Sequence, residues 1–322
     1  MRGRFDPPKD FGQEPWRTHV AAHLRRRLAR LAAAMLIAAG VVAPAVDAAA
    51  QQPARDLLYR VQGAGGATVY LLGSIHLLTP DAYPLAPSVE TAYADADRVV
   101  FEVDLDSLHD RAGELVPRAL LFGRNGLRDL IPAEMYARVE RAVRRYPQSG
   151  VDMTVLNRFE PWMVALMLNQ LEWARIGLRA EDGIDVHFEA RAKRDGKAVG
   201  ALESVDFQLS LLDGLTIDEQ VEQLRQTLDD LPGTQARMDS VTAAWRAGDA
   251  EAVDRLVNTN LARDPRLYAR MLTDRNAAWV PQVEEMLRGT ADVLVIVGAA
   301  HLVGEQSVVA MLRSRGYTVD QM

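Results

Sequence analysis

The feature that most constrains this chain is a motif that occurs twice, once near each end of the sequence. Two apolar runs, Val69–Leu72 and Val293–Val297, each continue directly into Gly-x-x-His. Short runs rich in β-branched residues predict buried strands. His76 and His301 should therefore follow the carboxyl ends of two strands. Because ligands bind at that edge of an open α/β sheet, we expect the two imidazoles to share one site.

The composition narrows what such a site can contain. The chain has 322 residues, which is enough for one large α/β domain, and it has no cysteine. Disulfides, thiolate zinc sites and cysteine nucleophiles are therefore excluded, and a metal ion would have to be held by nitrogen and oxygen. The formal net charge of −7 gives no electrostatic reason to expect nucleic acid. We expect a peptide or small-molecule substrate, and the sequence leaves the oligomeric state open.

Residues 1–50 have the layout of a secretory signal peptide with an N-terminal extension. Basic residues, Arg25–Arg27 and Arg30, precede the uncharged stretch Leu31–Val46, and Ala48–Ala50 offers a cleavage site. An uncleaved membrane anchor is the alternative. However, a span needs about 20 apolar residues, and Leu31–Val46 is shorter than that. We therefore predict export to the periplasm, by the general or the twin-arginine route, with no stable membrane span after cleavage.

The rest of the chain, residues 51–322, predicts an α/β fold with a mixed sheet. The expected strands cover residues 57–62, 67–72, 98–103, 197–203, 293–297 and 316–319, and the first two are joined by a glycine-rich hairpin turn. Helical spacing of apolar residues dominates from about residue 105 to about residue 290, on either side of the strand at 197–203. We interpret this middle part as a large helical insertion between two halves of one sheet.

Four of the expected strands end in a group that can bind a metal ion or move a proton: His76, Glu102, Glu203 and His301. Two histidines with one or two glutamates form a nitrogen and oxygen set that suits Zn, Mn, Co or Fe. We predict that His76, Glu102 and His301 are the metal ligands. Glu203 would be a further ligand or the general base, or would instead cap the helix that follows it. The alternative for the two histidines is a purely structural role, in which they only cap the turns after their strands.

Three more residues are candidates for the same site. Ser74 precedes His76 by two residues, but no Gly-x-Ser-x-Gly elbow surrounds it, so we expect it to orient a ligand or to donate a hydrogen bond. Arg275 and Asn276 lie on a long predicted helix. Arg275 can pair with a carboxylate or stabilise an oxyanion, although a surface position is equally compatible with the pattern.

Six short motifs together resemble the TraB/PrgY/GumN family and occur in that family's order. They are Leu72–His76, Phe101–Asp104, Gly183–Asp185, Leu202–Ser204, Asp274–Trp279 and Val297–Gly304. The resemblance extends from about Leu57 to the end of the chain and is strongest to the GumN-like bacterial branch, which carries an export signal. This family is similar to the Tiki proteases, whose paired Gly-x-x-His motifs and glutamates are associated with divalent-metal proteolysis. It is more distantly similar to the erythromycin esterase (EreA) and ChaN fold group.

The resemblance implies an EreA/ChaN-like fold, with His76 and His301 as the paired histidines and Glu102 as their acidic partner. Glu203 matches the family's Leu-Glu motif, and Arg275 and Asn276 match its Arg-Asn motif. Together with the residues themselves, this implies an exported, divalent-metal-dependent hydrolase that acts on peptides.

Two other functions stay open at this stage. One is a non-catalytic periplasmic binding protein for a peptide or a haem-like ligand, in which Met163 and Met167 on an apolar helix would serve the haem. The other is a metal-independent esterase in which His76 acts as the base. Haem binding would give a Soret band, and the esterase would survive exhaustive chelation.

Overall fold

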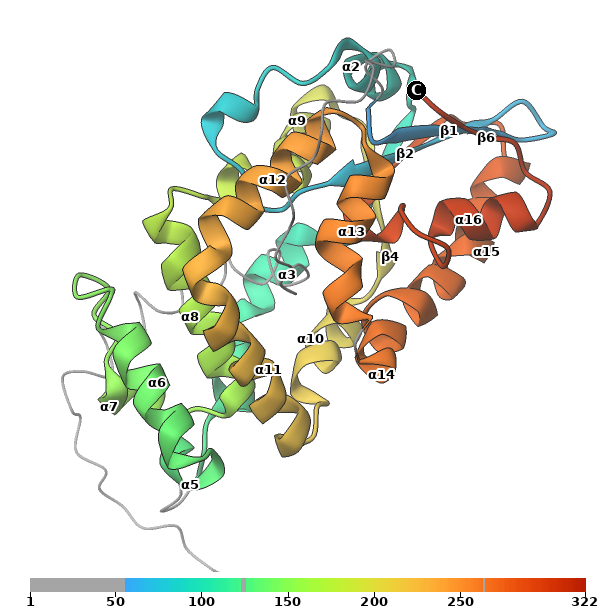
Figure 1. Ribbon diagram of the computed structural model, residues 1–322. Helices are drawn as coiled ribbons and strands as arrows, with labels where there is room; N and C mark the ends of the chain where they lie inside the picture. The colour runs from blue at the N-terminus through green and yellow to red at the C-terminus, as the bar shows by residue number, and fades with distance from the viewer. Residues whose placement is uncertain (1–55, 123–125, 263) are drawn as a thin grey trace, which may run out of the picture.

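A computed structural model describes residues 56–122, 126–262 and 264–322, and the predicted signal peptide lies outside these ranges. Figure 1 shows one mixed sheet with helices around it. The strands are β1 (Leu58–Gln62), β2 (Thr68–Ser74), β3 (Arg98–Val103), β4 (Ala198–Glu203), β5 (Val293–Gly298) and β6 (Val319–Gln321). Their order across the sheet is β4-β3-β5-β2-β1-β6. The α/β class and the mixed sheet are thus confirmed.

The two strands that carry the Gly-x-x-His motifs lie side by side in the middle of the sheet. β2 pairs with β5 in parallel, with Gly73 opposite Val297 and Ser74 opposite Gly298. β3 and β4 continue the parallel part, whereas β1 pairs antiparallel with both β2 and β6. Central parallel strands are covered on both faces, which is why their sequences read as continuous apolar runs. This arrangement brings both motifs out at the same edge of the sheet.

Helices account for most of the rest of the described chain. They are α2 (Pro87–Asp95), α3 (Leu105–Arg111), α4 (Leu115–Ala119), α5 (Leu127–Leu130), α6 (Ala133–Val143), α7 (Met153–Leu156), α8 (Pro161–Arg175), α9 (Ile184–Asp195), α10 (Val205–Asp213), α11 (Ile217–Asp230), α12 (Thr234–Arg246), α13 (Ala250–Leu261), α14 (Pro265–Tyr268), α15 (Asp274–Arg288) and α16 (Val308–Ser314). A short π-helix, Ala269–Thr273, joins α14 to α15. Among the helices of the described ranges, none is long and apolar enough to cross a membrane.

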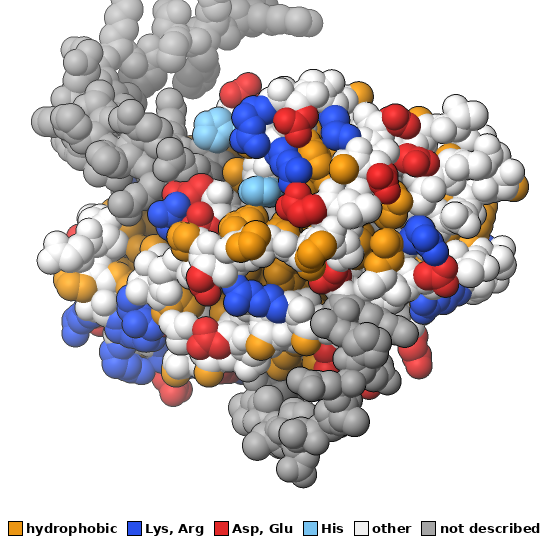
Figure 2. Space-filling view, turned by 90° about the horizontal axis from the view of Figure 1, so that it is seen from above, with side chains coloured by type: hydrophobic (Ala, Val, Ile, Leu, Met, Phe, Trp, Pro, Cys, Tyr) orange, Lys and Arg blue, Asp and Glu red, His pale blue; other side chains and the backbone are white. Residues whose placement is uncertain are grey.

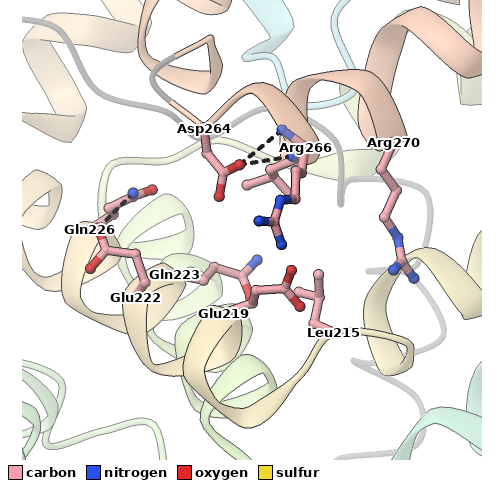
Figure 3. A pocket seen from close by; sticks show the side chains of 9 residues that line it. Leu215, Glu219, Glu222, Gln223, Gln226, Asp264, Arg266 and Arg270 are labelled. Carbon is pink, nitrogen blue, oxygen red and sulfur yellow. Dashed lines mark hydrogen bonds between the residues drawn. The ribbon is translucent and has the colours of Figure 1, made fainter.

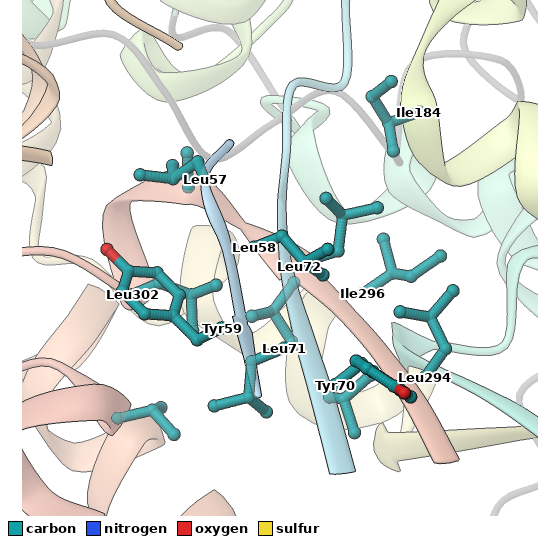
Figure 4. Close-up of a cluster of buried hydrophobic side chains, with 14 of the residues drawn as sticks. Leu57, Leu58, Tyr59, Tyr70, Leu71, Leu72, Ile184, Leu294, Ile296 and Leu302 are labelled. Atoms are coloured by element: carbon teal, nitrogen blue, oxygen red, sulfur yellow. The ribbon is translucent and has the colours of Figure 1, made fainter. Parts of the chain in front are cut away.

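Buried apolar side chains form two main clusters. The first, which we call the sheet core, surrounds β2 and β5 and includes Leu71, Leu72, Leu294 and Ile296 (Figure 4). The second, the helical core, lies within the insertion and is formed mainly by residues of α3–α8, α10 and α11. The insertion therefore has an apolar interior of its own, beside the sheet.

Met163 and Met167 belong to the helical core. They are 0% and 4% exposed, respectively, and both lie on α8, whose N-terminal half is buried all round. A helix without a polar face is typical of a buried core element. The two thioethers thus pack within the helical core of this fold.

Candidate functional site

All seven predicted site residues come together at the carboxyl edge of the parallel strands. Ser74 is the last residue of β2 and His76 follows it, Glu102 and Glu203 lie at the ends of β3 and β4, and His301 follows β5. Arg275 and Asn276 reach the same place from the first turn of α15. Every one of these side chains is almost completely shielded from solvent. The site is therefore buried, and its charged groups have to be satisfied by one another.

His76 is held by Asp185, an aspartate that the strand-end pattern does not predict as a site residue. Its Nδ1 lies 2.7 Å from Oδ2 of Asp185, and Ser74 Oγ donates to Oδ1 of the same carboxylate at 3.0 Å. The other ring nitrogen of His76, Nε2, is buried and has no hydrogen-bond partner in the described structure. Burial lowers the pKa of His76, but the nearby Asp185 and Glu102 carboxylates outweigh it and raise the pKa to about 9.

His301 has the same arrangement with an amide in place of the carboxylate. Asn276 Nδ2 donates to Gln306 O at 2.8 Å, so its Oδ1 must accept the hydrogen bond from His301 Nδ1, at 2.6 Å. We assign the Nδ1–H tautomer from this network. Nε2 of His301 then accepts from Arg275 Nη1 at 3.0 Å. Burial and the neighbouring Arg275 charge lower the pKa of His301 to about 3, so this ring is neutral.

Glu102 lies close to His301, with 3.9 Å between its Oε1 and His301 Nε2. Its Oε1 accepts from the backbone N–H of Gly298 at 2.6 Å, and its Oε2 accepts from Arg275 Nη2 at 2.6 Å. Burial alone would raise the pKa of Glu102, but Arg275 and the two histidines lower it to about 2. Gly298 marks the point of convergence, because a Cβ there would lie 3.1 Å from Glu102 Oε1 and 3.6 Å from His76 Nε2. The side chains of the site therefore occupy the space that a side chain at position 298 would need.

Glu203 is the anchor of Arg275. The guanidinium donates to both carboxylate oxygens, from Nε and Nη2, each at 2.9 Å. Trp279 Nε1 and Gln208 Nε2 donate to the same carboxylate at 2.8 and 2.6 Å. Burial raises the pKa of Glu203, although Arg275 opposes that shift. Because both oxygens already accept hydrogen bonds, a general-base role would require one of these donors to leave.

The structure also excludes the alternative that Glu203 caps the helix that follows it. Helix α10 is capped by Ser204, whose side chain accepts the hydrogen bond from Phe207 N. Glu203 is therefore not the N-cap of that helix, and its carboxylate is directed to Arg275 instead. Ser204 is a typical N-cap residue, which explains the local geometry.

Asp185 was missed because it does not follow a strand. It lies in the first turn of α9, and this turn packs against the loop that carries His76, where Ile184 N donates to Ile75 O at 3.1 Å. The available signal was the Gly183–Asp185 motif of the family resemblance, which had no role attached to it.

The donor set suits a divalent ion. His76 Nε2, His301 Nε2 and the Glu102 carboxylate are nitrogen and oxygen donors, and each histidine is oriented by a hydrogen bond to its Nδ1, as metal-binding histidines are. An orphaned buried Nε2 is a further sign that His76 has a partner of another kind. In the part of the chain that the structure describes, no group of three or more His, Asp or Glu side chains stands ready to hold a metal ion. Arg275 contacts both His301 and Glu102.

Away from these residues, a polar pocket lies between α11 and α14 (Figure 3). It is lined by acidic, basic and amide side chains, among them Glu219, Glu222, Asp264, Arg266 and Arg270. On the molecular face seen in Figure 2, acidic and basic side chains are likewise interspersed.

Comparison with known proteins assigns this chain to a family. The chain matches the sequence profile of the TraB/PrgY/gumN family over residues 57–321. It therefore belongs to the TraB/PrgY/gumN family. No solved structure shows a significant match to it.

Two kinds of relatives are informative. The chain is 26% identical over 249 residues to the Escherichia coli protein named "Uncharacterized protein YbaP", covering 77% of this chain and 89% of that protein. It is 26% identical over 301 residues to "Metalloprotease TIKI2" of Danio rerio, covering 78% of this chain and 58% of the relative. For "Metalloprotease TIKI1" of Homo sapiens the identity is 23% over 299 residues, with 78% and 59% coverage. The chain thus spans less than two thirds of these two metalloproteases.

Proposed function

We propose that this protein is an exported, divalent-metal-dependent hydrolase that cleaves peptides. The observation that carries the proposal is the pair of buried imidazoles at one sheet edge. Each has its Nδ1 fixed by a hydrogen bond, and Nε2 of His76 is left without a partner. Relatives named as metalloproteases, at 23–26% identity, support the reaction class. Export rests on the signal-peptide layout of residues 1–50.

In this proposal His76 Nε2, His301 Nε2 and Glu102 hold the ion, which would be Zn, Mn, Co or Fe. Bound there, a divalent ion supplies Lewis acidity, which polarises a substrate carbonyl and lowers the pKa of water.

The chain's own residues account for the other requirements of hydrolysis. Asp185 and Asn276 keep the two imidazoles in one orientation and one tautomer. Arg275 provides a positive charge within the buried site, where it can stabilise the negative charge that develops on a carbonyl oxygen. Glu203 and Trp279 position this guanidinium, and Ser74 holds Asp185.

One observation favours a second function, a metal-independent esterase. A carboxylate that binds Nδ1 of a histidine whose Nε2 is free is also the arrangement of a general-base dyad, and Asp185 and His76 have it. This alternative differs from our proposal in one measurable respect, because its activity would be unaffected by removal of metal ions.

The test is metal content and activity measured on the same full-length preparation. We expect about one Zn, Mn, Co or Fe ion per chain, peptide hydrolysis that is lost on exhaustive chelation, and recovery when the ion is returned. Absence of a bound ion after incubation with all four in excess would contradict the metal-dependent function. Hydrolysis that survives chelation would favour the esterase.

Replacing Asp185 with asparagine is expected to weaken metal binding by about 10- to 100-fold, the usual effect of losing a partner that orients a metal-binding histidine. The amide keeps the size of the side chain but removes the charge that faces His76 Nδ1. Titration with Co²⁺, monitored by calorimetry, measures the change. Affinity equal to that of the wild type would show that Asp185 does not orient His76.

A further inference from the structure

We propose that Arg275 competes with the metal ion for His301 and Glu102, and thereby sets the metal affinity of the site. Glu203 would be the anchor, the carboxylate that continues to bind the Arg275 guanidinium when the ion binds. This inference rests on the proposed function, and it assigns Arg275 and Glu203 roles in binding that precede any role in hydrolysis.

The contacts of one guanidinium carry the argument. Its Nη1 donates to His301 Nε2 at 3.0 Å, and its Nη2 donates to Glu102 Oε2 at 2.6 Å. Two of the three candidate ligands are thus already bound to a cation that belongs to the protein. The distance from His301 Nε2 to Glu102 Oε1 is 3.9 Å, so the two ligands are close enough to serve one partner.

The competition follows from the chemistry of the imidazole. A neutral histidine whose Nδ1 carries the proton has one lone pair, on Nε2, and it can be given to an N–H donor or to a metal ion but not to both. A divalent ion on His301 therefore requires Nη1 of Arg275 to leave. The two cations also repel each other, and this repulsion is strong because Arg275 is 1% exposed.

Glu203 makes that departure feasible. Nε and Nη2 of Arg275 both bind Glu203, so the guanidinium keeps two charged hydrogen bonds when Nη1 is released. The Glu203 carboxylate is itself fixed by Trp279 and Gln208. A buried arginine has no access to water, so this fixed carboxylate is what can compensate its charge once Glu102 serves the ion.

The mechanism predicts opposite effects for two substitutions in one ion-pair network. Arg275→Lys keeps a positive charge, but a lysine has no planar fork that can hold Glu203 and His301 at once. We expect this variant to bind Co²⁺ about tenfold more tightly. Glu203→Gln removes the charge of the anchor, so Arg275 holds Glu102 and His301 more firmly, and we expect Co²⁺ binding about tenfold weaker.

The double variant Arg275→Lys/Glu203→Gln separates this role from direct ligation by Glu203. If Glu203 acts through Arg275, its replacement has little effect once the arginine is gone, and the double variant binds Co²⁺ about as tightly as Arg275→Lys. Should Glu203 itself bind the ion, the double variant stays weak. That result would overturn the anchor role.

The experiment is a Co²⁺ titration of the full chain and the three variants, by calorimetry and by the visible absorption of bound Co²⁺. Circular dichroism checks the fold of each. Wild-type binding combined with equal or weaker binding by Arg275→Lys would overturn the inference and leave the proposed function intact. If that variant does not fold, binding by Glu203→Gln as tight as in the wild type still overturns the inference. No Co²⁺ binding by any of the proteins would overturn both.

Discussion

Replacing His76 with alanine is expected to lower metal-supported peptide hydrolysis by roughly 10³-fold, equivalent to about 4 kcal/mol of transition-state stabilisation. The imidazole is the proposed ligand with no competing partner on Nε2, so its loss removes a metal-binding atom without freeing another. The measurement is kcat/KM on a peptide mixture, together with metal content after dialysis.

The substitution leaves the Asp185 carboxylate with one of its two hydrogen-bond partners, because Ser74 still donates to Oδ1. We therefore expect a loss of stability of about 1–3 kcal/mol, and activity should be measured well below the unfolding temperature. His109→Ala is the matched control, since His109 is exposed on α3 and should leave hydrolysis and metal content unchanged. Full activity of the His76 variant would exclude the proposed ligand role.

The pattern of an apolar run followed by a polar group predicts side chains that the fold brings together, because this pattern depends only on local sequence. An apolar run followed by a polar group marks both a strand and its end, and it gave His76, Glu102, Glu203 and His301 together. The parallel pairing of β2 with β5, which makes one site of two distant motifs, depends on the order of strands in the sheet. That order is set by packing across the whole domain and has no signature within either motif.

Arg275 shows where local pattern stops being informative. On the sequence its position on a long helix was compatible with a surface charge, yet it is 1% exposed. Its burial is explained by the two glutamates of β3 and β4, which neutralise it, and by the ring of Trp279, whose centroid lies 4.8 Å from its guanidinium carbon. Each of these partners is distant in the sequence or unremarkable by itself, so only the fold reveals the network.

Asp185 illustrates a second limit. An aspartate near the start of a helix is ordinarily explained by the helix dipole and needs no further role. Here the helix start is docked on the His76 loop, and the same carboxylate becomes the partner of His76 Nδ1. The feature that permits this docking is Gly183, the residue just before the helix, whose missing side chain leaves room for the backbone of His76.

Gly183→Ala is expected to destabilise the protein by about 2–3 kcal/mol, the cost of overpacking a close contact, and to weaken metal binding in the molecules that remain folded. A Cβ at this position would lie 2.3 Å from the carbonyl oxygen of His76 and 2.7 Å from its carbonyl carbon. Both are backbone atoms, so no side-chain rotation relieves the overlap. The φ of Gly183 is −67°, which any residue adopts, and the glycine is therefore required by contact alone.

Relief of this overlap must separate the start of α9 from the His76 loop. That movement lengthens the hydrogen bond between Asp185 and His76 Nδ1. Chemical unfolding measures the first effect and Co²⁺ titration of the folded variant measures the second. Gly233→Ala is the matched control, because nothing lies within 4 Å of its Cβ position, and its stability should change by no more than about 0.5 kcal/mol. If Gly183→Ala were as stable as this control, α9 would not be docked tightly enough to orient His76. The role of Asp185 in the site would then have to be abandoned.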